Sequence, residues 1–417
     1  MKILVLGPGA REHAIVLALL AETADHQIVC APGNAGVAAS GVEVAELAYT
    51  DPAVVAAFVA ERGFDLVIIG PEAPLVAGVA DPLRAAGVAV FGPDQAAAAL
   101  EGSKAFAKRI MDEANVPTGR AERVTSVEDA ARVLDEFGAP YVVKADGLAA
   151  GKGVLVTSDR DAALNHVATW APQGDVLVEE FLDGQEVSLF FLADGHNVLP
   201  LSPAQDYKRI FDGDKGPNTG GMGAYSPLPW VADDFVEEIT RTVAVPTVRQ
   251  LEAEGTPFVG LLYCGLIVTE KGVRVIEFNA RFGDPETQVV LARLESSLSE
   301  YLLATAEGRL AELEAPTFSP DPAVIVVVAS EGYPETAATG REITGLEAAE
   351  AVEGVHVVHA ATERGEGGSW ISTGGRVLGV VARGATFGEA RERAYEAAAH
   401  IKLEGSQHRT DIAARVA

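Results

Sequence analysis

The chain has 417 residues, 48% of them hydrophobic and 22% charged, a composition typical of a globular protein with about two to four domains. Its formal net charge of −28 repels nucleic acid and anionic membranes, so both are excluded as general partners and any anion-binding site must be local. The longest apolar runs, 14–21 and 324–329, are too short to span a bilayer.

The first hundred residues alternate strand-like and helix-like segments. Residues 2–9 (KILVLGPG), 66–74 (LVIIGPEAP) and 88–94 (VAVFGPD) read as strands that end in glycine turns, and 51–62 and 77–86 read as helices. This alternation predicts an α/β fold with a doubly wound parallel sheet, whose glycine turns lie at the carboxyl edge where ligands bind.

The first glycine turn differs from that of a nicotinamide enzyme. In residues 7–12 (GPGARE), Glu12 takes the position of the third glycine and would block close packing of helix and strand. The second strand, within 27–36, ends without the acidic residue that holds an adenosine ribose. The loop is therefore expected to bind one phosphate through backbone N–H groups. Glu72 either contacts a sugar or an amine, or it is a solvated turn residue without a binding role.

The compartment is indicated by the N-terminus and the cysteines. Met1-Lys2 leads directly into the first strand, which predicts that no signal peptide is present. Cys30 and Cys264 lie in apolar strand-like runs and are expected to be core residues rather than a disulfide. We therefore expect a cytoplasmic protein.

Lysines and glycines characterise the next part of the chain. Lys104 begins a helix, where it is either solvated or bound to an anion, and Lys144 follows a buried strand and so requires an anionic partner. The loop 147–153 reads G-x-x-x-G-K-G, one residue short of Walker A spacing, and no Ser or Thr follows Lys152. A P-loop NTPase is thus excluded, although a glycine loop between two strands can still cover phosphates.

Two later stretches carry polar groups. Residues 175–192 predict a strand, a linker with Glu179 and Glu180, and a second strand from Glu186. The alternative for each of these three glutamates is a solvated carboxylate without a binding role. Residues 205–227 are too glycine-rich and polar for a regular element, and long ordered loops in compact domains are usually functional. We expect this loop to contact substrate.

Residues 260–279 read as a hairpin that turns at 270–272. Because side chains alternate along a strand, Val273, Val275, Glu277 and Asn279 are expected on one face. A carboxylate and an amide oxygen about 6.6 Å apart along the strand suit a hard cation such as Mg²⁺.

The segment after this hairpin offers an alternative and a helix start. The alternative is that Glu277 pairs with Arg281 in a buried strand, which would leave no metal site. Asp284 and Pro285 predict an N-cap and a first helical residue, so that a helix N-terminus opens beside the metal.

A proline-rich linker, 314–322, marks a boundary before the C-terminal hundred residues. Short strands at 323–330, 355–360 and 376–384 and an amphipathic helix at 386–401 predict a small α/β domain without catalytic groups. His356 and His359 should face opposite ways on their strand and are a poor ligand pair.

Seven ordered motifs, covering residues 1 to about 290, resemble the glycinamide ribonucleotide synthetases, also called phosphoribosylamine–glycine ligases, within the ATP-grasp superfamily. These motifs are GPGAREHA (7–14), APGNAG (31–36), GPEAPLVAG (70–78), LEGSKAFAK (100–108), KADGLAAGKGV (144–154), PNTGGMGAYSP (217–227) and IEFNARFGDPETQ (276–288). Weaker similarity resumes at 374–384 and 408–413.

The resemblance implies an ATP-grasp fold of three domains. An N-terminal Rossmann-like domain would span 1–102, and the ATP-grasp domain 103–315, with a small mobile lid subdomain at about 118–188. A small C-terminal α/β domain would span 316–417.

The resemblance also implies the reaction, a step of de novo purine biosynthesis. The carboxylate of glycine would attack the γ-phosphate of ATP to form glycyl phosphate. The amine of 5-phospho-D-ribosylamine would then displace phosphate, giving glycinamide ribonucleotide, ADP and Pi. No side-chain nucleophile is needed, because positioning and charge neutralisation suffice.

Carried over residue by residue, the resemblance implies four sets of site residues. Catalytic groups would be Arg281, Lys144 and Asp206. ATP would be bound by Lys104, Lys144, Gly147, Gly151, Lys152, Gly153, Glu179, Glu180, Phe181, Leu182 and Glu186. The substrates glycine and phosphoribosylamine would be bound by Gly9, Arg11, Glu12, Asn34, Pro71, Glu72, Asp206, Lys208, Asn218, Thr219, Gly220, Gly221, Met222 and Asp284. Mg²⁺ or Mn²⁺ would be held by Glu277 and Asn279.

The chain departs from the family pattern at a few positions. Residues 7–10 (GPGA) stand where the family commonly has G-N-G-G, Tyr207 replaces a frequent histidine, and 162–174 is short. A sister ATP-grasp ligase, such as a carboxylase or a formate-dependent transformylase, is an alternative that motifs 217–227 and 282–288 argue against. A non-catalytic nucleotide sensor is another, which would be expected to lack the metal and phosphate residues. We expect small-molecule partners only and a monomer, with a weak dimer as the alternative.

Overall fold

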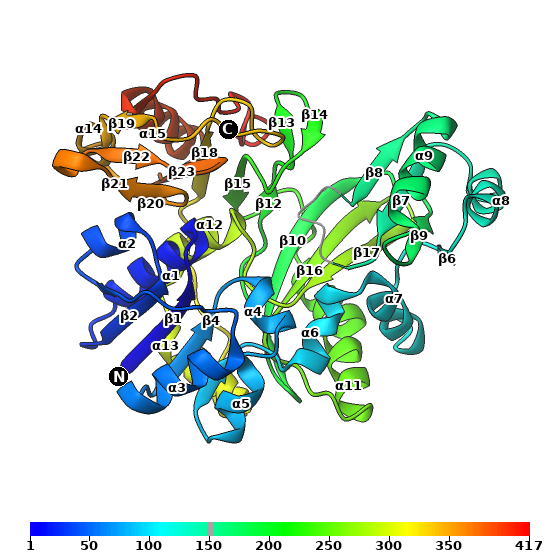
Figure 1. The fold of residues 1–417 in the computed structure, drawn as a ribbon, viewed down its shortest axis with the longest axis horizontal. Coiled ribbons are helices and arrows are strands. Elements are labelled where there is room, and N and C mark those ends of the chain that lie inside the picture. Colours follow the sequence, from blue (N-terminus) through cyan, green and yellow to red (C-terminus); the bar gives the residue numbers. More distant parts are fainter. Residues whose placement is uncertain (148–152) are drawn as a thin grey trace.

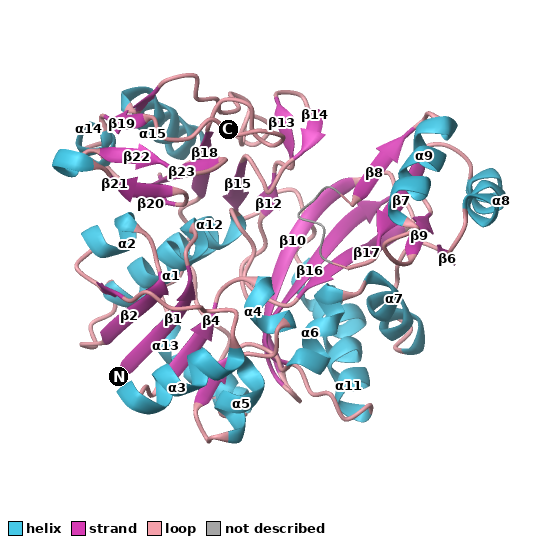
Figure 2. Ribbon diagram, viewed as in Figure 1, coloured by secondary structure: helices cyan, strands magenta, loops and turns pink. Residues whose placement is uncertain are grey.

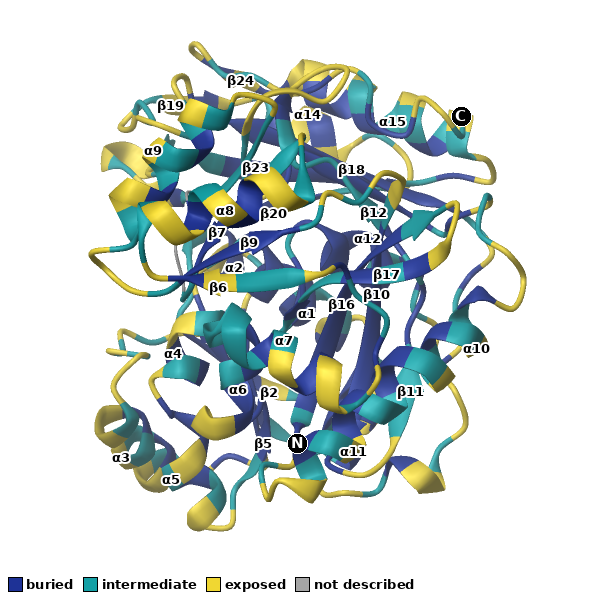
Figure 3. Ribbon diagram, turned by 90° about the vertical axis from the view of Figure 1, so that its right-hand side faces the viewer, coloured by how far each residue is buried: buried dark blue, intermediate teal, exposed yellow. Residues whose placement is uncertain are grey.

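The computed structural model describes residues 1–147 and 153–417, and Figures 1 and 2 show an N-terminal unit, a central sheet, a small projecting unit and a C-terminal unit. Gly151 and Lys152, predicted to bind ATP, lie outside the described residues. Figure 3 shows that the strands form the buried interior and that exposed residues concentrate on the helices and connecting loops.

The N-terminal unit is built on a parallel sheet of order β3-β2-β1-β4-β5. Alternate residues of β1 pack into two different cores, Ile3 and Val5 on one face and Leu4 and Leu6 on the other, so the sheet is covered on both sides. The predicted doubly wound sheet is confirmed. Its strands are β1 (Lys2–Gly7), β2 (Gln27–Pro32), β3 (Glu43–Val44), β4 (Leu66–Ile69) and β5 (Ala89–Phe91), and its helices are α1 (Ala10–Leu20), α2 (Ala35–Ala39), α3 (Pro52–Arg62), α4 (Glu72–Val76), α5 (Ala80–Ala85) and α6 (Gln95–Gly102).

The central sheet is antiparallel, with the order β11-β10-β16-β17. The predicted hairpin forms its edge, since β16 ends at Thr269 and β17 starts at Gly272. The strands are β10 (Gln185–Asp194), β11 (Val198–Pro200), β16 (Val259–Thr269) and β17 (Gly272–Asn279), and the helices of this part are α7 (Lys104–Glu113), α10 (Phe235–Ile239), the π-helical η1 (Thr240–Ala244), α11 (Val245–Ala253), α12 (Glu286–Arg293), α13 (Leu298–Ala306) and the 3₁₀ helix η2 (Leu310–Glu312).

A small antiparallel sheet of order β6-β9-β7-β8, here called the lid sheet, projects to the right in Figure 1. It carries its own hydrophobic core, in which Val133 of α8 and Val167 of α9 pack against Val143 and Val178 of the sheet. The lid sheet consists of β6 (Ala121–Val124), β7 (Tyr141–Ala145), β8 (Val154–Thr157) and β9 (Val176–Glu179), with helices α8 (Val127–Phe137) and α9 (Arg160–Trp170).

The C-terminal unit contains a five-stranded sheet of order β12-β15-β18-β23-β20 and a four-stranded sheet of order β21-β22-β19-β24. Two strands of the first sheet, β12 (Gln205–Asp206) and β15 (Gly223–Ser226), come from earlier in the chain. The predicted strands and the long helix are confirmed. The elements are β18 (Ala323–Ala329), β19 (Glu342–Thr344), β20 (Val355–His359), β21 (Thr362–Arg364), β22 (Trp370–Ser372), β23 (Arg376–Arg383), β24 (Lys402–Leu403), α14 (Leu346–Glu350), the 3₁₀ helix η3 (Glu366–Gly368) and α15 (Phe387–His400).

The prediction that residues 205–227 lack regular structure is wrong. They form β12 (Gln205–Asp206), β13 (Arg209–Phe211), β14 (Lys215–Asn218) and β15 (Gly223–Ser226). Tertiary pairing overrides local composition, because β15 hydrogen-bonds to β18 and thereby joins the C-terminal sheet. Residues 205–227 are thus attached directly to the C-terminal unit.

Two expectations about the whole chain are met among the described residues. Cys30 and Cys264 are both free and buried, as expected of core cysteines. None of the helices in the described ranges has the length and apolarity needed to cross a bilayer.

Candidate active site

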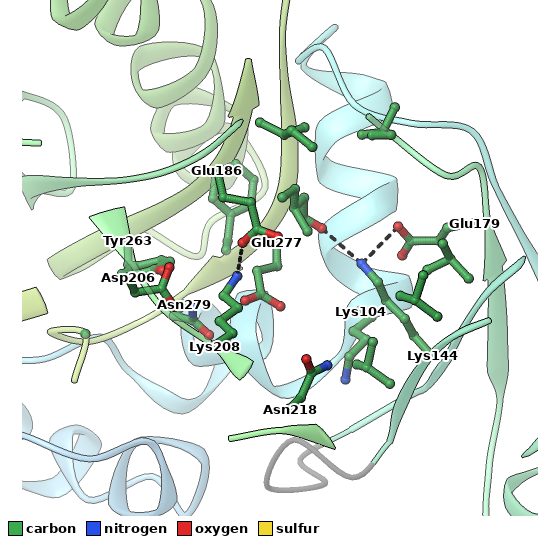
Figure 4. A pocket seen from close by; sticks show the side chains of 18 of the residues that line it. Lys104, Lys144, Glu179, Glu186, Asp206, Lys208, Asn218, Tyr263, Glu277 and Asn279 are labelled. Carbon is green, nitrogen blue, oxygen red and sulfur yellow. Dashed lines mark hydrogen bonds and ion pairs between the residues drawn. The ribbon is translucent and has the colours of Figure 1, made fainter. Parts of the chain in front are cut away.

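A cavity of about 640 Å³ lies where the central sheet, the lid sheet, the last turn of α6 and one side of α7 meet. Figure 4 shows lysine and carboxylate side chains pointing toward one another across it. The cavity is lined by most of the predicted site residues within the described ranges: Glu72, Lys104, Lys144, Gly147, Gly153, Glu179, Glu180, Phe181, Leu182, Glu186, Asp206, Lys208, Asn218, Thr219, Gly220, Glu277, Asn279, Arg281 and Asp284.

Lys144 and Glu179 sit on neighbouring strands of the lid sheet, and both are almost fully buried. Lys144 Nζ donates to Glu179 Oε2 over 3.0 Å, which confirms that Lys144 has an anionic partner. Lys108 Nζ lies 3.2 Å from the same oxygen and also donates to Gly119 O. Burial alone would raise the pKa of Glu179, but the two lysines outweigh it and the pKa is lowered. Lys108 was not among the site residues predicted from the sequence.

A β-bulge in β17 changes which side chains face the cavity. Gly265 pairs with Glu277 and Leu266 with Val275, so Ile276 is an extra residue. Val275 and Phe278 consequently pack in the same core, and strict alternation fails after Val275. The prediction that Val273 and Val275 share a face with Glu277 and Asn279 is therefore wrong. The bulge also presents the carbonyl of Ile276 to Lys144 Nζ, 3.3 Å away.

Glu277 lies among cations on the cavity wall, with Lys208 and Lys104 on either side of it in Figure 4. Burial would raise its pKa, but Lys208, Lys144 and Lys104 together lower it, so Glu277 is ionised. The carboxylate of Glu277 and the amide of Asn279 line the same cavity and supply hard oxygen donors. Within the described ranges no group of three His, Cys, Asp or Glu residues could hold a metal by itself. The donor set fits Mg²⁺, which completes its shell with water and phosphate oxygens.

The start of α7 is joined to the glycine loop. Ser103 caps the helix, with Oγ accepting from Phe106 N over 3.1 Å. Lys104 Nζ donates to Gly147 O over 2.8 Å, and Asp146 accepts from Lys104 N over 2.5 Å and from Ser103 Oγ over 3.0 Å. Lys104 therefore lies at the beginning of the glycine loop and is not a solvated lysine.

Arg281 pairs with two carboxylates, neither of them Glu277. Its Nη2 lies 2.9 Å from Glu101 Oε1 and its Nε lies 3.5 Å from Glu72 Oε2. Glu101, which sequence analysis missed, also accepts from Ala280 N over 2.7 Å. Burial raises the pKa of Glu101, while Arg281 acts in the opposite direction. The alternative of a Glu277–Arg281 pair is not realised.

Asp206 and Lys208 lie at the opposite end of the cavity from the lid sheet. Lys208 Nζ donates to Glu186 Oε2 over 2.5 Å. Burial raises the pKa of Asp206 to about 8, although Lys208 opposes the shift. Burial would lower the pKa of Lys208, but the neighbouring carboxylates, Glu186 first, raise it well above its ordinary value.

Behind Asp206 lies a buried hydrogen-bonded group that sequence analysis missed. Tyr263 Oη and Ser188 Oγ each donate to Glu286 Oε1 over 2.9 Å. Glu286 is buried at the start of α12 and lines the cavity. It belongs to the motif IEFNARFGDPETQ, so the motif itself was a signal for this residue.

Arg11, Glu12 and Asn34 support the N-terminal loop and are not among the lining residues. Glu12 is fully buried, and its carboxylate accepts from Gly9 N over 2.7 Å and from Arg11 Nε over 2.6 Å. Asn34 caps α2 and donates from Nδ2 to Pro8 O and to His359 O, each over 2.8 Å. Asn34 thereby joins the loop to β20 of the C-terminal unit.

The remaining predicted substrate residues also lie outside the cavity lining. Met222 is fully buried and packs against Ile210 and Ala329, and Pro71 is buried as the N-cap of α4. Gly221 has φ of +110°, and a Cβ there would lie 2.3 Å from Pro285 Cδ, so only glycine fits this turn.

The predicted N-cap at Asp284 is wrong. Helix α12 begins at Glu286, and its N-cap is Pro285, which has no side-chain cap bond. Pro285 has φ of −105° and ψ of 16°, which is outside the helical range, so the helix starts one residue later than predicted. Asp284 Oδ1 instead accepts from Gln288 Nε2 over 3.0 Å and pairs with Arg376 at 3.2 Å.

Models of the N, ATP-grasp (A) and C domains of phosphoribosylglycinamide synthetase match residues 1–101, 102–287 and 323–415. The chain belongs to the phosphoribosylglycinamide synthetase family. Similar proteins include a phosphoribosylamine–glycine ligase of Leifsonia xyli subsp. xyli, 67% identical over 416 residues, and one of Streptomyces coelicolor, 57% identical over 422 residues. Each alignment covers 100% of both chains.

Solved structures agree with this membership. The crystal structure of phosphoribosylamine–glycine ligase from Thermotoga maritima is 32% identical, with a TM-score of 0.85, over 99% of this chain and 100% of that one. A biotin carboxylase–β,γ-ATP complex from Campylobacter jejuni has a TM-score of 0.74 over 98% of this chain and 92% of that one, but is 14% identical and shows the fold alone. As a phosphoribosylglycinamide synthetase, the chain is an ATP-dependent ligase, which confirms the predicted family, fold class and enzyme class.

Proposed function

We propose that the chain joins glycine to 5-phospho-D-ribosylamine through glycyl phosphate, giving glycinamide ribonucleotide, ADP and Pi in de novo purine biosynthesis. The carrying observation is the ring of cations around Glu277, in which Lys208, Lys144 and Lys104 together lower the pKa of the carboxylate despite its burial. Such a pocket stabilises transferring phosphoryl oxygens by charge, without a nucleophilic side chain.

The nucleotide lies between the lid sheet and the central sheet in this proposal. Lys104, Lys144, Gly147 and Gly153 hold its phosphates, together with Gly151 and Lys152. Lys144 and Lys108 both contact Oε2 of Glu179, so Oε1 is assigned to the amino group of adenine. The backbone of Phe181 and Leu182 follows the base, Glu180 flanks it, and Glu186 accepts the ribose hydroxyls.

Glu277 and Asn279 would hold Mg²⁺ or Mn²⁺, which suits their oxygen donors and the phosphates of the nucleotide. When bound, the cation neutralises charge on the phosphate chain. The chain's own cations act on the same charge, because Lys144, Lys208 and Arg281 line the cavity near Glu277.

The glycine carboxylate attacks the γ-phosphorus and expels ADP, and an oxygen of that carboxylate becomes the bridge of glycyl phosphate. The amine of phosphoribosylamine then attacks the carbonyl carbon, the bridging oxygen leaves with phosphate, and the amine loses a proton. Arg281 and Lys144 neutralise the negative charge at the reacting groups, and Asp206 accepts a hydrogen bond from the amine. Holding the reactants in contact supplies much of the acceleration.

The substrate end comprises Glu72, Asp206, Lys208, Asn218, Thr219, Gly220 and Asp284, all of which line the cavity. Gly9 is the N-cap of α1, and the backbone N–H groups of the first turn that follows it favour a phosphate. Arg11, Glu12, Asn34, Pro71, Gly221 and Met222 act by fixing the backbone of the two loops that bind this substrate.

We further infer domains spanning 1–102, 103–315, with the lid subdomain at about 118–188, and 316–417. We propose a monomer. We also propose that the protein is cytoplasmic, because the free thiols of Cys30 and Cys264 fit a reducing compartment.

The test is ADP release with Mg-ATP, glycine, and phosphoribosylamine generated in the assay from ribose 5-phosphate and ammonia. Each component is omitted in turn. Release that requires both glycine and the amine, with the ribonucleotide amide identified by mass, is the expected result. Release with bicarbonate or formate in place of glycine would contradict the proposal.

A further inference from the structure

Arg376, the first residue of β23, reaches from the C-terminal unit to the back of the active site. It is half-buried and is not itself among the residues that line the cavity. Its Nη1 donates to Gly220 O over 2.6 Å and to Asp284 O over 2.9 Å. One guanidinium group therefore connects two lining residues that are far apart in the sequence.

Side chains of the C-terminal unit bind both the N–H and the carbonyl of Gly220. Gly220 N donates to Tyr333 Oη over 2.9 Å, while Gly220 O accepts from Arg376. A Cβ on Gly220 would lie 2.9 Å from Arg376 Cζ, and a Cβ on Gly375 would lie 2.2 Å from the Tyr333 ring. Both glycines are needed because the two side chains pack directly on the backbone.

The same guanidinium orients Asp284. Nη1 of Arg376 lies 3.2 Å from Asp284 Oδ1, and Gln288 Nε2 donates to that oxygen over 3.0 Å. The other oxygen, Oδ2, lies 4.0 Å from where a Cβ on Gly9 would be. Asp284 is thus turned toward the start of α1, the end of the cavity assigned to the phosphoribosyl group.

The Gly220 turn also determines the position of Lys208. The N–H and the hydroxyl of Thr219 each donate to Lys208 O over 2.8 Å. A shift of the turn would therefore move the backbone that carries the Lys208 ammonium group, which pairs with Glu186 inside the cavity.

We propose that Arg376 is a positioning residue for phosphoribosylamine, holding Gly220 and Asp284 in the arrangement that binds this substrate. The inference rests on the proposed function and goes beyond it, because it gives the C-terminal unit a direct part in substrate binding. The residues assigned to the nucleotide lie on the lid sheet, α7, the linker before β10 and β10 itself, and the Arg376 side chain contacts none of them, so ATP binding should depend little on Arg376.

The test compares Arg376→Ala and Arg376→Lys with the wild type in the complete ligation assay, with each substrate varied separately. We expect Arg376→Ala to raise the apparent KM for phosphoribosylamine about tenfold or more, as loss of about 1.4 kcal/mol of binding would. The KM for ATP should stay within about twofold. Arg376→Lys should recover part of the loss, because one ammonium group replaces one of several contacts. Tyr333→Phe removes a single hydroxyl and should give a smaller effect in the same direction.

Arg383→Ala is the matched control. Arg383 ends the same strand, and its Nη2 donates to Ser319 Oγ over 2.8 Å, away from the cavity. One contradicting result is that Arg376→Ala and Arg383→Ala change every KM, kcat and the melting temperature to the same extent. That result would show that Arg376 is merely structural, and the inference would be overturned. An unchanged KM for phosphoribosylamine would overturn it too. Absence of ligation by both the wild type and Arg383→Ala would overturn the proposed function, and this inference with it.

Discussion

Lys144 and Glu179 form an ion pair between adjacent strands of the lid sheet, with side chains only 6% and 7% exposed. Lys108 contacts the same carboxylate, so one negative charge stands between two positive ones. Glu179→Gln would leave two buried cations facing each other, and Lys108→Met would leave a neutral pair. We expect Glu179→Gln to lower the free energy of unfolding of the ligand-free protein by about 3 to 5 kcal/mol, and Lys108→Met by clearly less.

Urea unfolding of both variants, followed by far-UV circular dichroism, measures this difference. Equal losses for the two substitutions would show that Glu179 does not hold the lysines together.

Removal of the carboxylate from β17 should abolish turnover without unfolding the protein. Glu277→Ala removes the one carboxylate assigned to the cation, and loss of a contact made in the transition state typically costs about a hundredfold or more in kcat. Asn279→Ala should cost less, because an uncharged donor is lost. Steady-state kinetics and circular dichroism measure the two effects. Residual Glu277→Ala activity above about a tenth of wild type would assign the cation to another group.

Glu186 is assigned to the ribose of ATP, and it pairs with Lys208 in the ligand-free protein. Glu186→Ala is expected to raise the apparent KM for ATP more than that for glycine. Glu252→Ala serves as the control, because Glu252 pairs with His196 on the surface. If Glu186→Ala and the control leave the KM for ATP equally unchanged, the ribose lies elsewhere.

Acidic pH should weaken the junction between the N-terminal and C-terminal units through buried histidines. His13 Nδ1 accepts from His359 N over 2.9 Å. Burial lowers the pKa of His13 to about 3 and that of His359 to about 4. In the unfolded chain these residues titrate near 6.5, so as the pH falls below that value the unfolded state takes up protons that the folded state does not, and stability is lost.

Each such histidine should reduce the free energy of unfolding by up to about 1.4 kcal/mol per pH unit below about pH 6. Urea unfolding at pH 7.5, 6.0 and 5.0 measures the slope. His13→Gln keeps a side chain able to accept the backbone bond and should show a shallower slope than wild type. Identical slopes for the two proteins would contradict the assigned burial of a neutral His13.

Much of the architecture could be predicted because its signals are local. The strand–helix alternation of the first hundred residues, the hairpin turn at 270–272 and the strands of the C-terminal unit follow from short-range hydrophobic patterns. Likewise, a lysine after a buried strand requires an anionic partner, and Lys144 pairs with Glu179.

What sequence reasoning missed depends on contacts between distant segments. The bulge at Ile276 arises from pairing with β16, and β12 and β15 exist because β18 offers an edge to pair with. The role of Arg376 is invisible locally, because its partners Gly220 and Asp284 meet it only in the folded chain.

The most direct test of the central claim follows oxygen from glycine. The complete reaction is run with glycine labelled by ¹⁸O at both carboxylate oxygens, and the Pi released is analysed by mass spectrometry. If glycyl phosphate is the intermediate, each Pi carries one ¹⁸O, because the bridging carboxylate oxygen leaves with phosphate. Unlabelled Pi, formed together with glycinamide ribonucleotide, would contradict activation of glycine by phosphoryl transfer.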